Sequence, residues 1–109
     1  MSDHGYVYVF VRNDLSYAQK AVQSAHAAVE ACRWYLDEDL PHPSIIILVV
    51  KNEAKLKKVE EEIKNMEGGV FHYEAFREPD MGNEMTAIAT GPLYGDQRDM
   101  FKRYQLLKE

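Results

Sequence analysis

The sequence predicts a single α/β domain with a three-layer α/β/α arrangement, in which helices cover both faces of a mixed sheet of about four strands. Runs of β-branched and aromatic residues alternate along the chain with segments of helical periodicity. The runs at 6–11 and 45–50 are apolar almost throughout, which is typical of strands buried on both faces. With 109 residues the chain is large enough for one core and too small for two, so we expect one domain spanning 1–109.

The first half of the chain predicts a strand, a helix and a second strand. The first strand is expected at 6–11, and a polar turn follows it. Ser16 and Gln19 have the spacing of a capping box, so we expect the first helix to begin near Tyr17. A loop with two prolines then leads into the second strand at 45–50.

The second half of the chain continues the alternation. Asn52 is expected to cap a second helix that runs to about Met66, where two glycines follow. The remaining expected elements are strands at 70–76 and 85–90, a short helix at 96–103 and an extended segment at 104–107.

The composition excludes several classes of protein. The single cysteine, Cys32, excludes an internal disulfide and suits a reducing compartment, so we expect a cytoplasmic protein. No apolar run is long enough to span a membrane, and no signal peptide is evident. His4, His42 and His72 lack the spacing of metal ligands, and no glycine-rich phosphate loop is present, so neither a metal nor another cofactor is expected.

The formal net charge of −5 weighs against extensive contact with nucleic acid, because phosphate binding needs clustered basic side chains. The lysines between 51 and 64 alternate with glutamates, as on a solvated helix face. A smaller basic set flanks the first helix and could hold a few phosphates: Arg12, Lys20 and Arg33.

The first helix concentrates polar side chains on one stripe, because Gln19, Gln23, His26 and Glu30 follow its periodicity. An adjoining apolar stripe holds Val22, Ala25, Val29 and Cys32. One histidine beside amides does not define a catalytic site, so the spacing alone favours a structural histidine at a helix–sheet boundary.

Three motifs carry a resemblance to a known family. Arg12, Asp14 and Leu15 reproduce R-x-D-L after a strand, and 21–27 reproduces A-A-Q-x-x-H-A with one alanine replaced by valine. The segment TAIATGP at 86–92 is similar to a late strand with a Gly-Pro exit. On these motifs the chain resembles the type 2 peptidyl-tRNA hydrolases of archaea and eukaryotes over nearly its whole length, as a divergent member.

This resemblance implies that the chain cleaves the ester between a peptide and tRNA, with tRNA as partner and no cofactor. It also implies that the first and fourth strands are neighbours. The family is often dimeric, so a homodimer is one possibility, and 34–36 would suit either its contact surface or an edge of the core equally well. The residues that we expect to be catalytic are His26, Asp80 and Lys20, and those that we expect to bind substrate are Arg12, Asn13, Asp14, Gln19, Gln23 and Thr86.

The sequence departs from the family pattern at two places. Gln19 stands where the family has a lysine, and Lys20 follows one position later, a rotation of about 100° on a helix. Lys20 would therefore substitute for that lysine only if the helix begins later than expected. The family's D-A-G-[RK]-T-Q turn is reduced to Asp80 and Gly82, followed by different residues at 83–85. Two functions therefore remain open: a peptidyl-tRNA hydrolase, and a non-catalytic relative that binds RNA or a protein partner.

Overall fold

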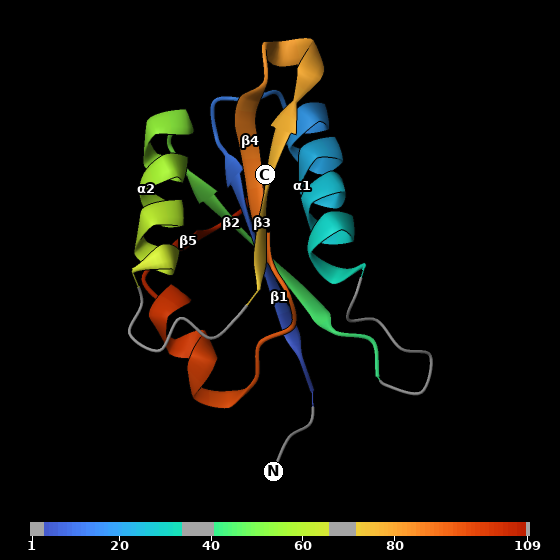
Figure 1. Ribbon diagram of the computed structural model, residues 1–109, viewed down its shortest axis with the longest axis vertical. Coiled ribbons are helices and arrows are strands. Elements are labelled where there is room, and N and C mark those ends of the chain that lie inside the picture. The colour runs from blue at the N-terminus through green and yellow to red at the C-terminus, as the bar shows by residue number, and fades with distance from the viewer. Residues whose placement is uncertain (1–3, 34–40, 66–71, 109) are drawn as a thin grey trace.

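The computed structural model describes residues 4–33, 41–65 and 72–108 (Figure 1). The predicted dimer surface at 34–36 lies outside them. In chain order the described elements are β1 (Tyr6–Arg12), α1 (Tyr17–Cys32), β2 (Ser44–Val50), α2 (Glu53–Lys64), β3 (Tyr73–Glu78), the 3-10 helix η1 (Pro79–Met81), β4 (Glu84–Thr90), the 3-10 helix η2 (Gly95–Phe101) and β5 (Gln105–Leu106).

The described strands form one mixed sheet in the order β3-β4-β1-β2-β5. β1 and β2 are parallel, whereas β4 pairs antiparallel with both β1 and β3. The expected adjacency of the first and fourth strands is therefore confirmed. The expected count of about four strands was one too low, because Gln105 and Leu106 pair antiparallel with β2 as a fifth strand.

The two α-helices lie on opposite faces of this sheet (Figure 1). Successive strand residues point to opposite faces, so Val9 packs with Ala27 of α1 and the next residue, Phe10, packs with Leu56 of α2. Phe101 of η2 joins the α2 side of the core. The described part of the chain contains no helix that is long and apolar enough to span a membrane.

Both predicted helix starts are confirmed by their caps. The Ser16 hydroxyl accepts a hydrogen bond from the Gln19 backbone N–H at 3.1 Å. The Asn52 side-chain oxygen accepts one from the Lys55 N–H at 3.0 Å. Each side chain satisfies a backbone donor that has no partner within its own helix, which fixes where the helix begins.

Other predicted boundaries differ from the structure. The third strand reaches Glu78, two residues beyond its expected end, and the beginning expected at 70–71 lies outside the described residues. The expected end of the second helix near Met66 is likewise outside them; its described part ends at Lys64. The short helix expected at 96–103 is a 3-10 helix that begins at Gly95.

α1 contacts the sheet through its smallest side chains. Ser24 and Ala27 are buried, whereas Val22 and Val29 of the predicted apolar stripe are 52% and 67% exposed. Ala27 meets Ala89 of β4 in the same buried cluster. Small residues on both partners bring the helix backbone close to the sheet, and a β-branched side chain between them would hold the two apart.

We expect Leu56→Ala to lower the free energy of unfolding by about 2–5 kcal/mol, because it removes a fully buried side chain from the contact between α2 and the sheet. Urea denaturation measures this change. The matched control is Leu106→Ala, whose leucine is 54% exposed. Equal losses in the two variants would contradict this description of the core.

Candidate functional site

Three segments meet at the upper end of the molecule in Figure 1: the loop after β1, the first half of α1, and the turn between β3 and β4. Arg12 bonds to Glu84 across this end, and Gln23 bonds to Glu78. The sequence-predicted site residues fall into two groups, one around Arg12 and one around Gln23.

Arg12 joins the first of these segments to β4. Its Nε and Nη2 donate to the two carboxylate oxygens of Asp14 at 2.9 and 3.0 Å, and its Nη1 donates to Glu84 at 2.6 Å. Nη1 also lies 3.3 Å from the carbonyl oxygen of Met85. Arg12 is only 8% exposed. A buried guanidinium with these partners holds the protein together and has little capacity left for substrate.

The same contacts set the charges around Arg12. Hydrogen bonding to Asp14, opposed by burial and assisted by Glu84, raises the pKa of Arg12 further above its usual range. The Arg12 guanidinium holds the pKa of Asp14 below its ordinary value of 3.8. The negative charge of Asp14 is therefore compensated within the protein.

Lys20 points back toward the turn after β1. Its Nζ donates to the Asn13 side-chain oxygen at 2.8 Å. Because the helix begins at Tyr17, as the cap predicts, Lys20 lies in its first turn one position past Gln19. Gln19 is exposed, and its backbone N–H is bound by the cap. Lys20 therefore does not take the helical position of the family's lysine, although its ammonium group lies over the turn after β1.

A chain of three side chains crosses the contact between α1 and the sheet. The Thr86 hydroxyl donates to the Gln23 carbonyl oxygen at 2.6 Å, and the Gln23 amide donates to a Glu78 carboxylate oxygen at 2.8 Å. Thr86 is fully buried and Gln23 is 4% exposed. The amide of Gln23 therefore has a fixed orientation, and its role is to position Glu78.

An irregularity in the sheet turns Thr86 toward α1. Phe76 pairs with Ala87 and Arg77 pairs with Met85, so Thr86 is an extra residue in β4. Thr86 and Ala87 consequently both face α1, one through Gln23 and the other through the apolar cluster. Bulges of this kind re-aim a side chain at the end of a ladder.

Glu78 is the residue of this site that the sequence interpretation missed. Its second oxygen accepts from the Asp80 backbone N–H at 3.3 Å. The Gln23 bond, the Asp80 bond and the nearby His26 outweigh desolvation and hold the pKa of Glu78 below its ordinary value of 4.5. The signal available in the sequence was its position, since Glu78 directly precedes Pro79 at the end of a strand.

His26 lies one helical turn beyond Gln23, on the same face of α1. Its ring stacks on Phe76 of β3, with centroids 4.7 Å apart and an interplanar angle of 7°. His26 was expected at the border of a buried stripe, and it is exposed. Within the described part of the chain its ring nitrogens form no hydrogen bond. The stack fixes the ring plane and leaves those nitrogens accessible.

Asp80 lies in η1 and is exposed. Its backbone N–H bonds to Glu78, while its carboxylate forms no hydrogen bond or ion pair among residues 4–33, 41–65 and 72–108. The chain then turns sharply through left-handed backbone at Gly82 and Asn83. The carboxylate that the structure brings to Gln23 is that of Glu78, two residues before the one singled out from the sequence.

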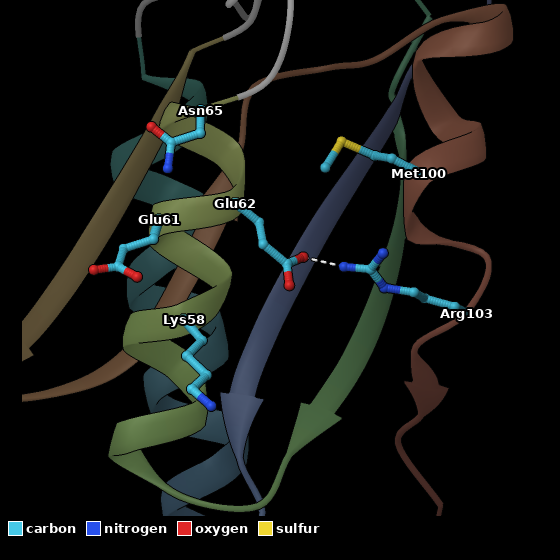
Figure 2. Close-up of a pocket in the computed structure, with 6 residues that line it drawn as sticks. All are labelled: Lys58, Glu61, Glu62, Asn65, Met100 and Arg103. Atoms are coloured by element: carbon cyan, nitrogen blue, oxygen red, sulfur yellow. Dashed lines mark hydrogen bonds and ion pairs between the residues drawn. The ribbon is translucent and has the colours of Figure 1, made fainter.

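A separate hollow of about 570 Å³ lies between α2 on one side and the end of η2 with the residues after it on the other (Figure 2). Across it Glu62 forms an ion pair with Arg103 and accepts a hydrogen bond from the Tyr104 hydroxyl at 2.5 Å. Figure 2 shows Glu61 and Asn65 pointing away from Arg103. The Glu62–Arg103 pair and the Tyr104 hydrogen bond connect α2 to the segment after η2 across this hollow.

No family model matches this chain, and no curated protein does. Among the described residues no group of three His, Cys, Asp or Glu side chains is arranged to hold a metal ion.

We expect Arg12→Gln to raise the pKa of Asp14 toward 3.8, because the Arg12 hydrogen bond is the main cause of its lowering. In the wild type the folded-state pKa of Asp14 is below the unfolded one. The contribution of ionised Asp14 to the stability of the wild type is therefore complete at pH values above its unfolded-state pKa. This contribution is lost as the pH falls through the folded-state pKa of Asp14.

NMR titration of the Asp14 carboxyl group measures the shift, and urea midpoints compared at about pH 7 and about pH 3 measure the stability. Arg77→Gln is the control, because that exposed arginine bonds only to the Asn83 carbonyl among the described contacts. An unchanged pKa of Asp14 in Arg12→Gln would refute the assignment.

Proposed function

We propose that this protein hydrolyses the ester between a peptide and tRNA, as a divergent relative of the type 2 peptidyl-tRNA hydrolases. One observation carries the proposal: the buried chain from Thr86 through Gln23 ends on the Glu78 carboxylate, beside an accessible imidazole on α1. Apolar side chains would fill this helix–sheet contact without the cost of burying polar groups. The hydrogen-bonded row of Thr86, Gln23 and Glu78 is explained by its support of a charged carboxylate at the surface.

The proton acceptor in the proposed reaction is His26. Ester hydrolysis needs a base that takes a proton from the attacking water, and histidine is the side chain most often used. The lowered pKa of Glu78 makes that carboxylate a weak base. Its negative charge instead stabilises, through space, the imidazolium that forms when His26 accepts the proton.

Lys20 is the proposed donor to the negative charge that develops on the ester oxygen. Asn13 holds its ammonium group at one end of the same helix. A fixed positive charge at that place stabilises a tetrahedral intermediate more than it stabilises the neutral ester. Gln23 is too buried for this role, since its carbonyl and amide groups are bound to Thr86 and Glu78.

The alternative is a non-catalytic relative that uses the same end of the molecule to bind RNA or a protein partner. Gln19 in place of a lysine and the net charge of −5 favour it. The three-layer classification, the homodimer and the cytoplasmic location belong to the same proposal, because they too follow from the sequence and its resemblance.

Single-turnover hydrolysis of an N-blocked aminoacyl-tRNA tests the proposal, with the spontaneous loss of the ester as baseline. We expect the wild type to exceed the baseline and His26→Ala to lose about 10²–10⁴-fold in rate, the usual contribution of a general base. His42→Ala is the control, because this exposed histidine lies just before β2, at the end of the sheet opposite to the loop after β1. A wild-type rate equal to the baseline would reject hydrolysis and favour the alternative, a non-catalytic relative that binds RNA or a protein partner.

Glu78→Gln separates a charge effect from a structural one. Removing the negative charge withdraws electrostatic support from the imidazolium that forms during the reaction, so we expect a rate lower by about tenfold. Asp80→Asn changes a carboxylate in the same turn and should leave the rate near that of the wild type. A Glu78→Gln rate equal to that of the wild type, or an equal loss in both variants, would contradict the role proposed for Glu78.

A further inference from the structure

A second recess opens at the same end of the molecule, between the loops that follow β1 and β2. Its volume is about 450 Å³. It is lined by Asn13 and Asp14 from the first loop, by 49–52 from the second, and by Gln105 of β5. None of the roles proposed for His26 and Glu78 uses this recess.

The topology of the sheet creates it. β1 and β2 are parallel neighbours, and their following helices cover opposite faces of the sheet (Figure 1). Where neighbouring parallel strands send their connections to opposite faces, the two loops diverge and leave a crevice at the carboxyl ends of the strands. Ligands of open α/β sheets bind in such crevices.

The charges around this crevice favour an anion. Lys51 lines it and forms no ion pair within the described parts of the chain, and Lys20 is held at its rim by Asn13. The carboxylate among the lining residues is that of Asp14, and Arg12 binds both of its oxygens. A compensated carboxylate beside unpaired lysine charge leaves a positive local field.

The other lining groups suit a nucleoside attached to such an anion. Val49 and Val50 provide apolar surface, and the side chains of Asn13, Asn52 and Gln105 provide amide donors and acceptors. Small-molecule sites usually combine apolar surface with a few polar groups, in volumes of about 300–1,000 Å³. A single nucleotide is within this range, whereas a bare phosphate would leave most of the crevice empty.

We propose that this crevice binds a 5′-phosphorylated nucleotide, with Lys51 at the phosphate and the valines and amides at the nucleoside. In an RNA ester the bound nucleotide belongs to the acceptor end, because the Asn13–Lys20 contact joins the crevice to the helix that carries His26. The assignment to the acceptor end of the RNA depends on the proposed function, whereas the binding of a nucleotide in the crevice does not.

Titration of ¹⁵N-labelled protein with adenosine 5′-monophosphate tests the first statement. We expect the largest amide shifts at Asn13, 51–52 and Gln105. Lys51→Ala should weaken binding about tenfold, the usual effect of losing one charge-assisted hydrogen bond. Lys64→Ala removes the same charge at the far end of α2 and should bind as the wild type does. Adenosine, which lacks the phosphate, should be insensitive to Lys51→Ala.

Absent binding, shifts centred elsewhere, or equal affinities of the two lysine variants would overturn the nucleotide site, whatever the hydrolysis assay gives. Crevice binding by a protein without hydrolase activity would keep the site and reject the proposed function. In an active protein we expect Lys51→Ala to raise KM for the aminoacyl-tRNA with little change in kcat. An unchanged KM would instead assign the crevice to a free nucleotide and reject the RNA end.

Discussion

The buried guanidinium of Arg12 holds together the segments on which the candidate site depends. It bonds to Asp14 in the turn before α1 and to Glu84 at the beginning of β4. The next backbone N–H of β4, that of Met85, donates to Glu53 in the first turn of α2 at 2.9 Å, so α2 is tied to the same place. Loss of one partner of such a buried charge leaves the rest uncompensated, which costs more than the intact pairs contribute. The loop after β1 and the turn after β3 therefore keep their relative position as long as this arginine is paired.

A second constraint is the close approach of α1 to the sheet. Gln23 can reach both Thr86 and Glu78 because Ser24 and Ala27 beside it are small and buried. A larger side chain on that face would lift the helix and stretch both hydrogen bonds. The small size of Ser24 and Ala27 therefore serves the hydrogen bonds of Gln23 as well as the packing of the core.

Much of the fold follows from local patterns in the sequence. The apolar runs predict β1 and β2, and Ser16 and Asn52 predict where the helices begin, because these signals act within a few residues. An extended segment was expected at 104–107 and contains the two residues of β5, but their pairing with β2 is a long-range contact that no periodicity contains. The end of β3 was placed two residues early for a similar reason, since Glu78 is held in the strand by pairing with Glu84 across the turn.

The candidate site was predictable in part. Helical spacing places Gln23 and His26 on one face, but the partner of each comes from a distant strand: Glu78 for the amide and Phe76 for the imidazole. Strict alternation along β4 would also turn Thr86 to the same side as Ile88, away from α1. Only the extra residue in the ladder reverses it, and that irregularity depends on pairing between strands, which a sequence pattern does not contain.

Because Thr86 is an extra residue in the ladder, a single mutation can remove the Thr86–Gln23 hydrogen bond without changing the pairing of the strands. Deleting the single codon for Thr86 would restore a regular ladder between β3 and β4, with Met85 and Ala87 still opposite their present partners. The core side chains would keep their faces, whereas Gln23 would lose the hydroxyl that orients it. The loss of one residue would therefore disorganise the site while the pairing of the two strands is kept.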